Sequence, residues 1–236
     1  MQVLTIPDLH GRDSWKNALE QFPHADKIVF LGDYVDSYDL GNHIIYDNLY
    51  EIIQFKKGET ERVELLLGNH DIQYMFFPKY RCSGFRPSMQ YDLFGLFNEN
   101  KRFFNVAFQV NNNLWTHAGV SENWLEENFH VIVQYGLTDN NYAEVFNVML
   151  NSKDNDVLHQ VSNLRGGYDY YGGITWADKQ ETMAAPLKNM NQYVGHTPLP
   201  KPFRYHMKGY DASITYLDCL QTVEEFRVIA TGQDET

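Results

Sequence analysis

Five short motifs combine carboxylate, amide or imidazole side chains with glycine, and each follows an apolar segment. In chain order they are residues 7–11 (PDLHG), 32–36 (GDYVD), 68–71 (GNHD), 116–119 (THAG) and 195–198 (GHTP). The apolar segments are short and end at turn residues, which is typical of buried strands. Such a pattern delivers oxygen donors and imidazoles to one edge of a sheet. It therefore predicts a site for two metal ions.

The candidate metal ligands include no thiolate. They are Asp8, His10, Asp33, Asn69, His117 and His196. This mixture suits Mn²⁺, iron or Zn²⁺ better than Ca²⁺, which binds oxygens alone, and it differs from cysteine-based structural zinc sites. An extended backbone at residues 8–10 would place Asp8 and His10 on the same side, where both could bind one ion. Asp33 follows a strand and a glycine, so its carboxylate could project past the sheet edge and bridge two cations.

Each motif alone has a structural alternative, because DxH can form an Asx turn and GNH can be a turn with an exposed histidine. The occurrence of all five after apolar segments favours the metal site. The remaining histidines lie in no such motif, and we expect them at the surface or in structural hydrogen bonds. They are His24, His43, His130, His159 and His206.

The net charge of −12 argues against a nucleic-acid partner, since phosphate backbones need a positive surface. If the substrate is a phosphate, bound cations must supply the local positive field. No run of about 18 apolar residues is present, so we expect no membrane span. The N-terminus reads as a first strand and not as a signal peptide, which makes the cytoplasm the expected location. Cys82 and Cys219 form no CxxC pair and are expected to be buried, reduced thiols.

Strands and helices alternate in the first third of the chain, which predicts βαβ units and a mostly parallel sheet. The helices in this part and just after it are expected at residues 14–21, 44–55, 72–77 and 89–98. Residues 103–110 and 113–119 flank an asparagine turn, which predicts a hairpin.

Beyond this hairpin we expect antiparallel strands, with helices at residues 121–129 and 142–150. Segments 213–218 and 224–230 read as a terminal hairpin. The loop 165–173 (RGGYDYYGG) is expected to border the site. A single domain over residues 1–236 is the simplest account.

The motif set resembles that of the calcineurin-like metallophosphoesterase superfamily, and specifically its serine/threonine phosphoprotein phosphatase branch of bacterial and phage type. That branch carries GDxHG, GDxVDRG, GNHE, a later HAG or HGG, and a final GHT, in the order found here. The resemblance spans nearly the whole chain. It implies an α/β fold (α+β in some schemes), a four-layer αββα sandwich in which two packed mixed β-sheets are flanked by helices.

The resemblance also implies a role for each metal ligand. Asp8 and His10 would hold the first metal ion and Asp33 would bridge both. The second ion would be completed by Asn69, His117 and His196, and Asn69 would also contact the substrate. The cofactors would be two divalent or mixed-valence ions, Mn, Fe or Zn.

By the same resemblance, His70 is the general acid and Asp36 orients it. A hydroxide that bridges two cations about 3.5–4 Å apart would attack phosphorus. The imidazolium would then protonate the leaving alkoxide, whose pKa is otherwise too high for a good leaving group. A carboxylate hydrogen-bonded to the imidazole would raise its pKa and fix its orientation.

Two arginines of the family pattern are missing, and both would bind phosphate oxygens. Ser37 stands where the VDRG arginine would be, and Asp178 lies near the position of the second. Arg165, in NLRGG, is the best replacement for substrate binding. Weaker alternatives are Arg12, Arg204 and Lys179.

These observations favour a metal-dependent hydrolase of phosphate monoesters that resembles serine/threonine protein phosphatases. An alternative is a bis(5'-nucleosyl)-tetraphosphatase-like nucleotide pyrophosphohydrolase, which shares the motifs. A third hypothesis is a non-catalytic metal-binding scaffold, but the presence of both His70 and Asp36 argues against it. The partner is expected to be a phosphoprotein, a small phosphate ester or a dinucleoside polyphosphate, with no nucleic acid or membrane partner.

Overall fold

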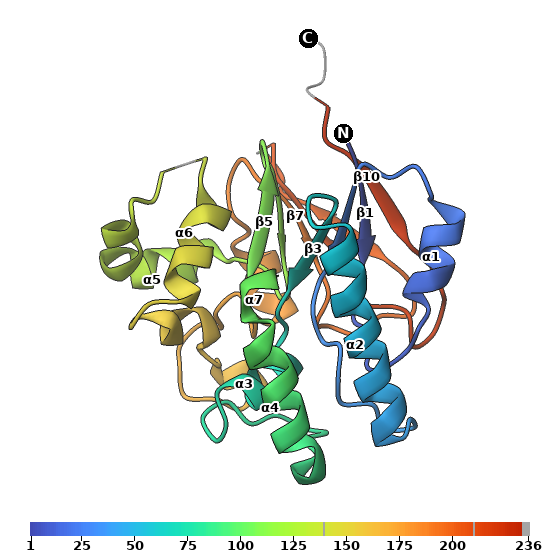
Figure 1. The fold of residues 1–236 in the computed structure, drawn as a ribbon. Helices are drawn as coiled ribbons and strands as arrows, with labels where there is room; N and C mark the ends of the chain where they lie inside the picture. Colours follow the sequence, from blue (N-terminus) through green and yellow to red (C-terminus); the bar gives the residue numbers. More distant parts are fainter. Residues whose placement is uncertain (139, 210, 233–236) are drawn as a thin grey trace.

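Two five-stranded β-sheets pack face to face between helices in the computed structural model, which describes residues 1–138, 140–209 and 211–232 (Figure 1). Helices α1 and α2 lie on one side of the sheets, and α5 and α6 lie on the other side. The expected mixed α/β fold, with two mixed sheets flanked by helices, is confirmed.

The first sheet has the order β10-β1-β2-β3-β4. Its strands are β1 (Gln2–Ile6), β2 (Lys27–Phe30), β3 (Val63–Leu66), β4 (Phe104–Asn105) and β10 (Arg227–Ala230). Strands β1 to β4 pair in parallel, as predicted, and β10 adds to β1 in the antiparallel direction. Parallel neighbours need crossover connections, and helices α1 (Trp15–Gln21) and α2 (Asn42–Gly58) supply the first two.

The second sheet has the order β5-β6-β7-β9-β8. Its strands are β5 (Ala107–Val110), β6 (Asn113–Thr116), β7 (Asn191–Val194), β8 (Phe203–His206) and β9 (Ser213–Tyr216). The predicted β5–β6 hairpin is confirmed, with Val110 opposite Asn113 and Asn111 at a φ of 52°. Its loop therefore has two residues, one fewer than the asparagine run suggested.

Two expectations about the second half of the chain are wrong. Strands β6, β7 and β9 pair in parallel and not antiparallel. Segments 213–218 and 224–230 do not form a terminal hairpin, because β9 lies inside the second sheet and β10 joins the first. The four residues of β9 are all buried, as expected of an interior strand with both faces covered.

The remaining helices are α3 (Asn69–Met75), α4 (Gln90–Glu99), α5 (Glu122–Ile132), α6 (Tyr142–Leu150) and α7 (Lys179–Ala184). Short 3₁₀ segments are Pro87–Met89, Lys101–Phe103, Val133–Tyr135, Asn155–His159 and Asn163–Arg165. All six predicted helices are present. The sequence patterns did not indicate α7 and β8, which are short. None of the helices among the described residues has the length and apolarity needed to cross a bilayer.

Period-two alternation along the strands explains how the sheets are held together. Val3 and Val29 of the first sheet pack against Trp115 and Tyr193 of the second. Their neighbours along the strands, such as Leu4 and others of the larger cluster, face the helices. The Trp115 Nε1–H donates to Thr5 Oγ1 at 2.9 Å, which satisfies the one polar group of that ring. The two sheets are thereby fixed relative to each other at the edge where the motifs lie.

Candidate metal centre

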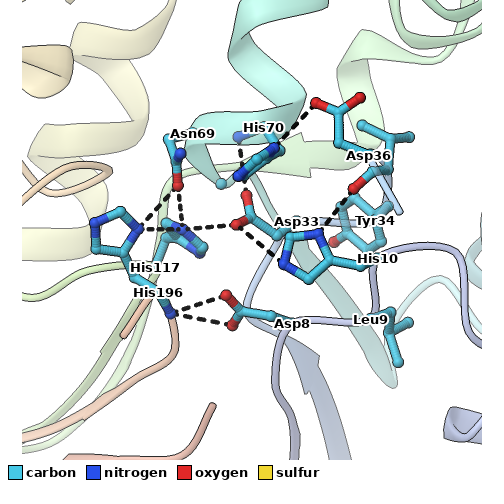
Figure 2. A network of polar contacts seen from close by, with 12 residues as sticks. Asp8, Leu9, His10, Asp33, Tyr34, Asp36, Asn69, His70, His117 and His196 are labelled. Atoms are coloured by element: carbon cyan, nitrogen blue, oxygen red, sulfur yellow. Dashed lines mark hydrogen bonds and ion pairs between the residues drawn. The ribbon is translucent and has the colours of Figure 1, made fainter. Parts of the chain in front are cut away.

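The predicted donor residues meet at one edge of the two sheets because each follows the carboxyl end of a strand. Asp33 and Asn69 lie three residues beyond β2 and β3, and His117 directly follows β6. His196 and Asp8 lie two residues beyond β7 and β1. Since these strands run parallel within each sheet, their ends point to the same side (Figure 2).

Two glycines let these loops approach closely. A Cβ at Gly68 would lie 2.1 Å from Asp33 Oδ1, and a Cβ at Gly195 would lie 1.9 Å from Asp8 Oδ1. Neither contact is possible, so glycine is required at both positions by close approach. The donors themselves are backbone-strained, since His10, Asp33 and His196 have φ of 47°, 53° and 65°. Such strain is typical of sites that the surrounding fold holds in place.

One group of donors centres on His117. Its Nε2 lies 2.9 Å from Asn69 Oδ1, 3.2 Å from His196 Nδ1 and 3.4 Å from Asp33 Oδ2. These separations match four ligands that surround one ion at about 2.0–2.2 Å. His196 Nδ1 also lies 2.9 Å from Asn69 Oδ1. Donors from both sheets thus converge on one point.

The chemistry of these donors fits a cation. His117 Nδ1 lies 2.8 Å from the carbonyl oxygen of Leu31, which can only accept, so Nδ1 carries the proton. Burial lowers the pKa of His117, which favours the neutral ring. Its Nε2 then presents a lone pair to the oxygens of Asn69 and Asp33, which repel it unless a cation lies between them. A histidine that donates its other N–H to a carbonyl is the usual arrangement at a metal.

A second group of donors shares Asp33. Ligand atoms of His10, Asp33 and His70 lie within 4.8 Å of one another, as do those of Asp33, His117 and His196. His10 Nδ1 donates to the carbonyl of Val35 at 3.0 Å, which leaves Nε2 3.9 Å from Asp33 Oδ2. Burial alone would raise the pKa of Asp33, but the surrounding histidines outweigh it and hold that pKa below its usual value. Asp33 therefore belongs to two adjacent groups that could each hold a metal ion.

Asp8 lies beside these groups without belonging to either among the described residues. Its two carboxylate oxygens accept the backbone N–H of His196 at 3.1 and 2.9 Å (Figure 2). The expected alternation across residues 8–10 is wrong, because β1 ends at Ile6 and His10 occupies a left-handed turn. Burial, with the charges of Asp218 and Asp33, raises the pKa of Asp8. A cation nearby would reverse that effect.

His70 and Asp36 form the predicted pair at the start of α3. His70 Nδ1 lies 3.0 Å from Asp36 Oδ2, and the His70 backbone N–H donates to Asp33 Oδ1 at 2.9 Å. Gln73 Nε2 and Tyr74 Oη also donate to Asp36. Burial alone would lower the pKa of His70, but the Asp33 charge and the Asp36 hydrogen bond raise it well above its usual value. Both carboxylates thus favour the protonated form of the imidazole.

Comparison with known proteins agrees with this geometry. The model of the calcineurin-like phosphoesterase family matches residues 1–217. The chain belongs to this family. It is therefore a phosphoesterase, a hydrolase that acts on phosphate esters. A comparison with curated proteins gives no significant match.

Solved structures show the same fold at low identity. The phosphoesterase is 17% identical to a cold-active protein-tyrosine phosphatase of a psychrophilic Shewanella species, with a TM-score of 0.57 over 98% of this chain and 75% of that chain. It is 15% identical to a protein serine/threonine phosphatase from Saccharomyces cerevisiae with similarity to human phosphatase PP5. That match has a TM-score of 0.52 and covers 92% of this chain and 67% of that chain. Such similarity concerns the fold alone.

A cleft of about 730 Å³ opens over the donors of the phosphoesterase and contains three arginines. Arg165 pairs with Asp178 at 2.8 Å and donates to Thr197 Oγ1 at 2.7 Å, next to His196 in the chain. Arg12 pairs with Asp39 at 3.1 Å. Arg165 thus lines the cleft, as expected for a residue of loop 165–173.

The other two replacement candidates are not part of this cleft lining. Arg204 donates to Ser213 Oγ and lines a separate cavity of about 1440 Å³, at the end of the sheets that carries the β5–β6 hairpin. Lys179 lies 4.8 Å from the centre of the Phe203 ring. Neither is placed to bind a phosphate over the metal donors.

The remaining histidines follow the expectation, whereas the expected burial of both cysteines is wrong for Cys82. Four of these histidines are exposed, namely His24, His43, His130 and His206. His159 is buried and hydrogen-bonded to Thr175. Both cysteines are free, and Cys219 is buried. Cys82 is half-buried in the cleft, where its Sγ lies close to His70 and Asp36.

Sequence reasoning missed three residues of this region. Asp71 accepts the N–H groups of Gly68, Asp33 and Tyr34 at 2.8, 2.7 and 3.0 Å, so it joins two of the motif loops. The sequence feature that could have identified Asp71 is its position as the last residue of the GNHD motif. Asp218 and Arg81 also line the cleft. Asp218 directly follows the apolar segment SITYL, as the other donors follow theirs, but no glycine motif surrounds it.

Proposed function

We propose that this phosphoesterase hydrolyses phosphate monoesters, as serine/threonine protein phosphatases do, with two metal ions held at the edge of the sheets. The proposed ligands are Asp8, His10, Asp33, Asn69, His117 and His196. The observation that carries the proposal is that Asp33 belongs to two groups of donors at once. When bound, two such ions activate water and neutralise phosphoryl oxygens. The donor chemistry suits Mn, Fe or Zn.

His70 is the proposed general acid. Asp36 accepts from its Nδ1, which leaves the Nε2 proton for the departing alkoxide. The raised pKa of His70 favours the imidazolium that such a transfer requires. The backbone N–H of His70 donates to Asp33, and its side chain donates to Asp36. The two carboxylates thus position the proposed acid next to the proposed metal site.

Arg165 is the proposed substrate-binding cation, together with the Asn69 amide. Its Nε is engaged by Asp178, and one terminal nitrogen is bonded to Thr197. This pairing orients the guanidinium beside His196 while donors remain for a phosphoryl oxygen.

We further propose a single domain over residues 1–236, because both sheets contribute donors to one group.

The test uses protein stripped of metal with a chelator and reconstituted with Mn²⁺, Fe²⁺ or Zn²⁺. We expect hydrolysis of p-nitrophenyl phosphate and of phosphoserine or phosphothreonine peptides only after reconstitution. Activity that survives complete metal removal, with metal content verified by mass spectrometry, would contradict the proposal.

The second candidate is a dinucleoside tetraphosphate pyrophosphohydrolase, and one observation favours it. Arg81 lines the cleft without a carboxylate partner among the described residues, and Tyr38 on the same cleft is 80% exposed. An extra cation suits a polyphosphate, and an exposed ring can stack on a nucleobase. Comparison of kcat/KM for diadenosine tetraphosphate and for the phosphopeptides decides between the two substrates.

A further inference from the structure

Asp218 is a buried carboxylate that lacks any hydrogen-bond partner for its side chain in the described parts of the chain. The residue is 1% exposed, and neither of its carboxylate oxygens is paired. An ionised carboxylate removed from water ordinarily needs several N–H donors or a cation. The described residues supply neither, so the carboxylate has room for a partner such as a bound cation.

The fold places Asp218 at the metal donors. Strands β7 and β9 are parallel with Val194 opposite Tyr216, so His196 and Asp218 each lie two residues beyond paired positions. The carbonyl of Asp218 accepts the Leu199 N–H at 2.8 Å, which anchors its backbone to the segment after His196. Asp218 lines the same cleft as His10 and Asp33.

The charges around Asp218 are mostly of its own sign. Asp8, whose oxygens accept the backbone N–H of His196, is close enough for the Asp218 charge to raise its pKa, and Asp33 lies in the same cleft as Asp218. Arg12, one of the cations of the lining, is already paired with both oxygens of Asp39. Asp33 and Asp218 thus both line the cleft, and no arginine or lysine is bound to Asp218 among the described residues.

We propose that Asp218 is a seventh residue of the metal centre, whose carboxylate helps to hold the divalent cations beside Asp8 and Asp33. The inference rests on the metal centre proposed above. Asp218 belongs to neither of the groups of donors that share Asp33, so its proposed place is at the margin of the site. Its carboxylate would add negative charge to the six proposed ligands.

The experiment measures Mn²⁺ binding by calorimetry and metal content by mass spectrometry, in wild type and in Asp218→Asn. We expect the variant to bind Mn²⁺ about 10–100-fold more weakly, the usual loss when a supporting residue of a metal site is removed. In the absence of metal, the variant should melt at a higher temperature than wild type, because a buried charge repulsion is gone. The rise in melting temperature on Mn²⁺ addition should be smaller.

Asp39→Asn is the matched control, because Asp39 lines the same cleft but is exposed and paired with Arg12. It should bind Mn²⁺ within twofold of wild type. Asp218→Ala gives the same comparison if the asparagine variant does not fold. Wild-type affinity in a folded Asp218 variant overturns the inference alone. Failure of the wild-type protein to bind Mn²⁺ overturns the proposed metal centre and this inference together.

Discussion

The His70 imidazole and the Asp36 carboxylate are joined by a 3.0 Å contact between Nδ1 and Oδ2. His70 belongs to helix α3, and other side chains of that helix bind Asp36. Gln73 and Tyr74 lie three and four residues after His70, on the same helix face, and both donate to Asp36. Asp36 itself has a φ of 65°. One turn of helix thus fixes the carboxylate that orients the proposed acid.

Replacement of His70 by Asn should lower turnover of an alkyl phosphate by about 10²–10⁴-fold, because general acid catalysis contributes this much for a poor leaving group. Turnover of p-nitrophenyl phosphate should fall far less, since its leaving group needs no proton. Steady-state kinetics on both substrates measure the difference. His43→Asn, at an exposed histidine, is the control. Equal losses on both substrates would remove His70 from the role of acid.

Replacement of Asp36 by Asn should shift the pH profile. Activity that needs protonated His70 is lost as the pH rises through the pKa of that residue. The Asp36 hydrogen bond helps to raise this pKa, so its loss should move the alkaline limb of kcat/KM to lower pH. Tyr74→Phe removes only one of the donors to Asp36 and should leave the limb in place. An unmoved limb in Asp36→Asn would contradict the assignment.

Replacement of Asp33 by Asn should cost both metal ions, because Asp33 alone belongs to both of the donor groups around the site. Replacement of His117 by Ala should affect mainly the second ion. Metal content per chain, measured after dialysis against limiting Mn²⁺, distinguishes the two. Retention of a full metal complement by Asp33→Asn would exclude a bridging role.

A methyl group at Gly68 should damage the site. Its Cβ would lie 2.1 Å from Asp33 Oδ1 and 2.8 Å from His117 Cε1. We expect Gly68→Ala to lose about 1–3 kcal/mol of unfolding free energy through overpacking, and to bind Mn²⁺ poorly. Gly95→Ala, in α4 with no atom near its Cβ, should instead gain about 0.5–1 kcal/mol. Urea unfolding of both variants tests the contrast.

Acid should destabilise the protein partly through His159. Burial lowers the pKa of His159 to about 3, against 6.5 for an unperturbed histidine. The unfolded chain therefore binds a proton that the folded chain does not, and stability falls as the pH drops from 6.5 toward 3. The slope from this group is about 1.4 kcal/mol per pH unit.

His159→Phe should remove that slope. Denaturant unfolding of metal-free protein between pH 6.5 and pH 4.5 measures it as a difference from wild type. His130→Gln, at an exposed position, is the control and should keep the wild-type slope. Parallel stability curves for wild type and His159→Phe would show that the ring is not kept neutral.

The sequence allowed much of this site to be predicted, because donors that directly follow apolar strands must lie at a sheet edge. The prediction failed where distant pairing decides the outcome. The last strand, β10, could pair with β9 or with β1. The choice depends on which sheet has an unpaired edge strand, and no local sequence pattern carries that information. Asp218, like Asp33, comes after an apolar strand, but no glycine motif marks it, and its unpaired oxygens are visible only in the folded chain.

In the group around His117, Asp33 and Asn69 follow strands of the first sheet, and His117 and His196 follow strands of the second. Asn69 and His196 are separated by 127 positions in the chain. An ion held there would be a cross-link that closes a long loop, and such links restrict the unfolded chain. Metal starvation would then shorten the lifetime of the protein as well as its turnover of substrate. Resistance to proteolysis would report on metal supply.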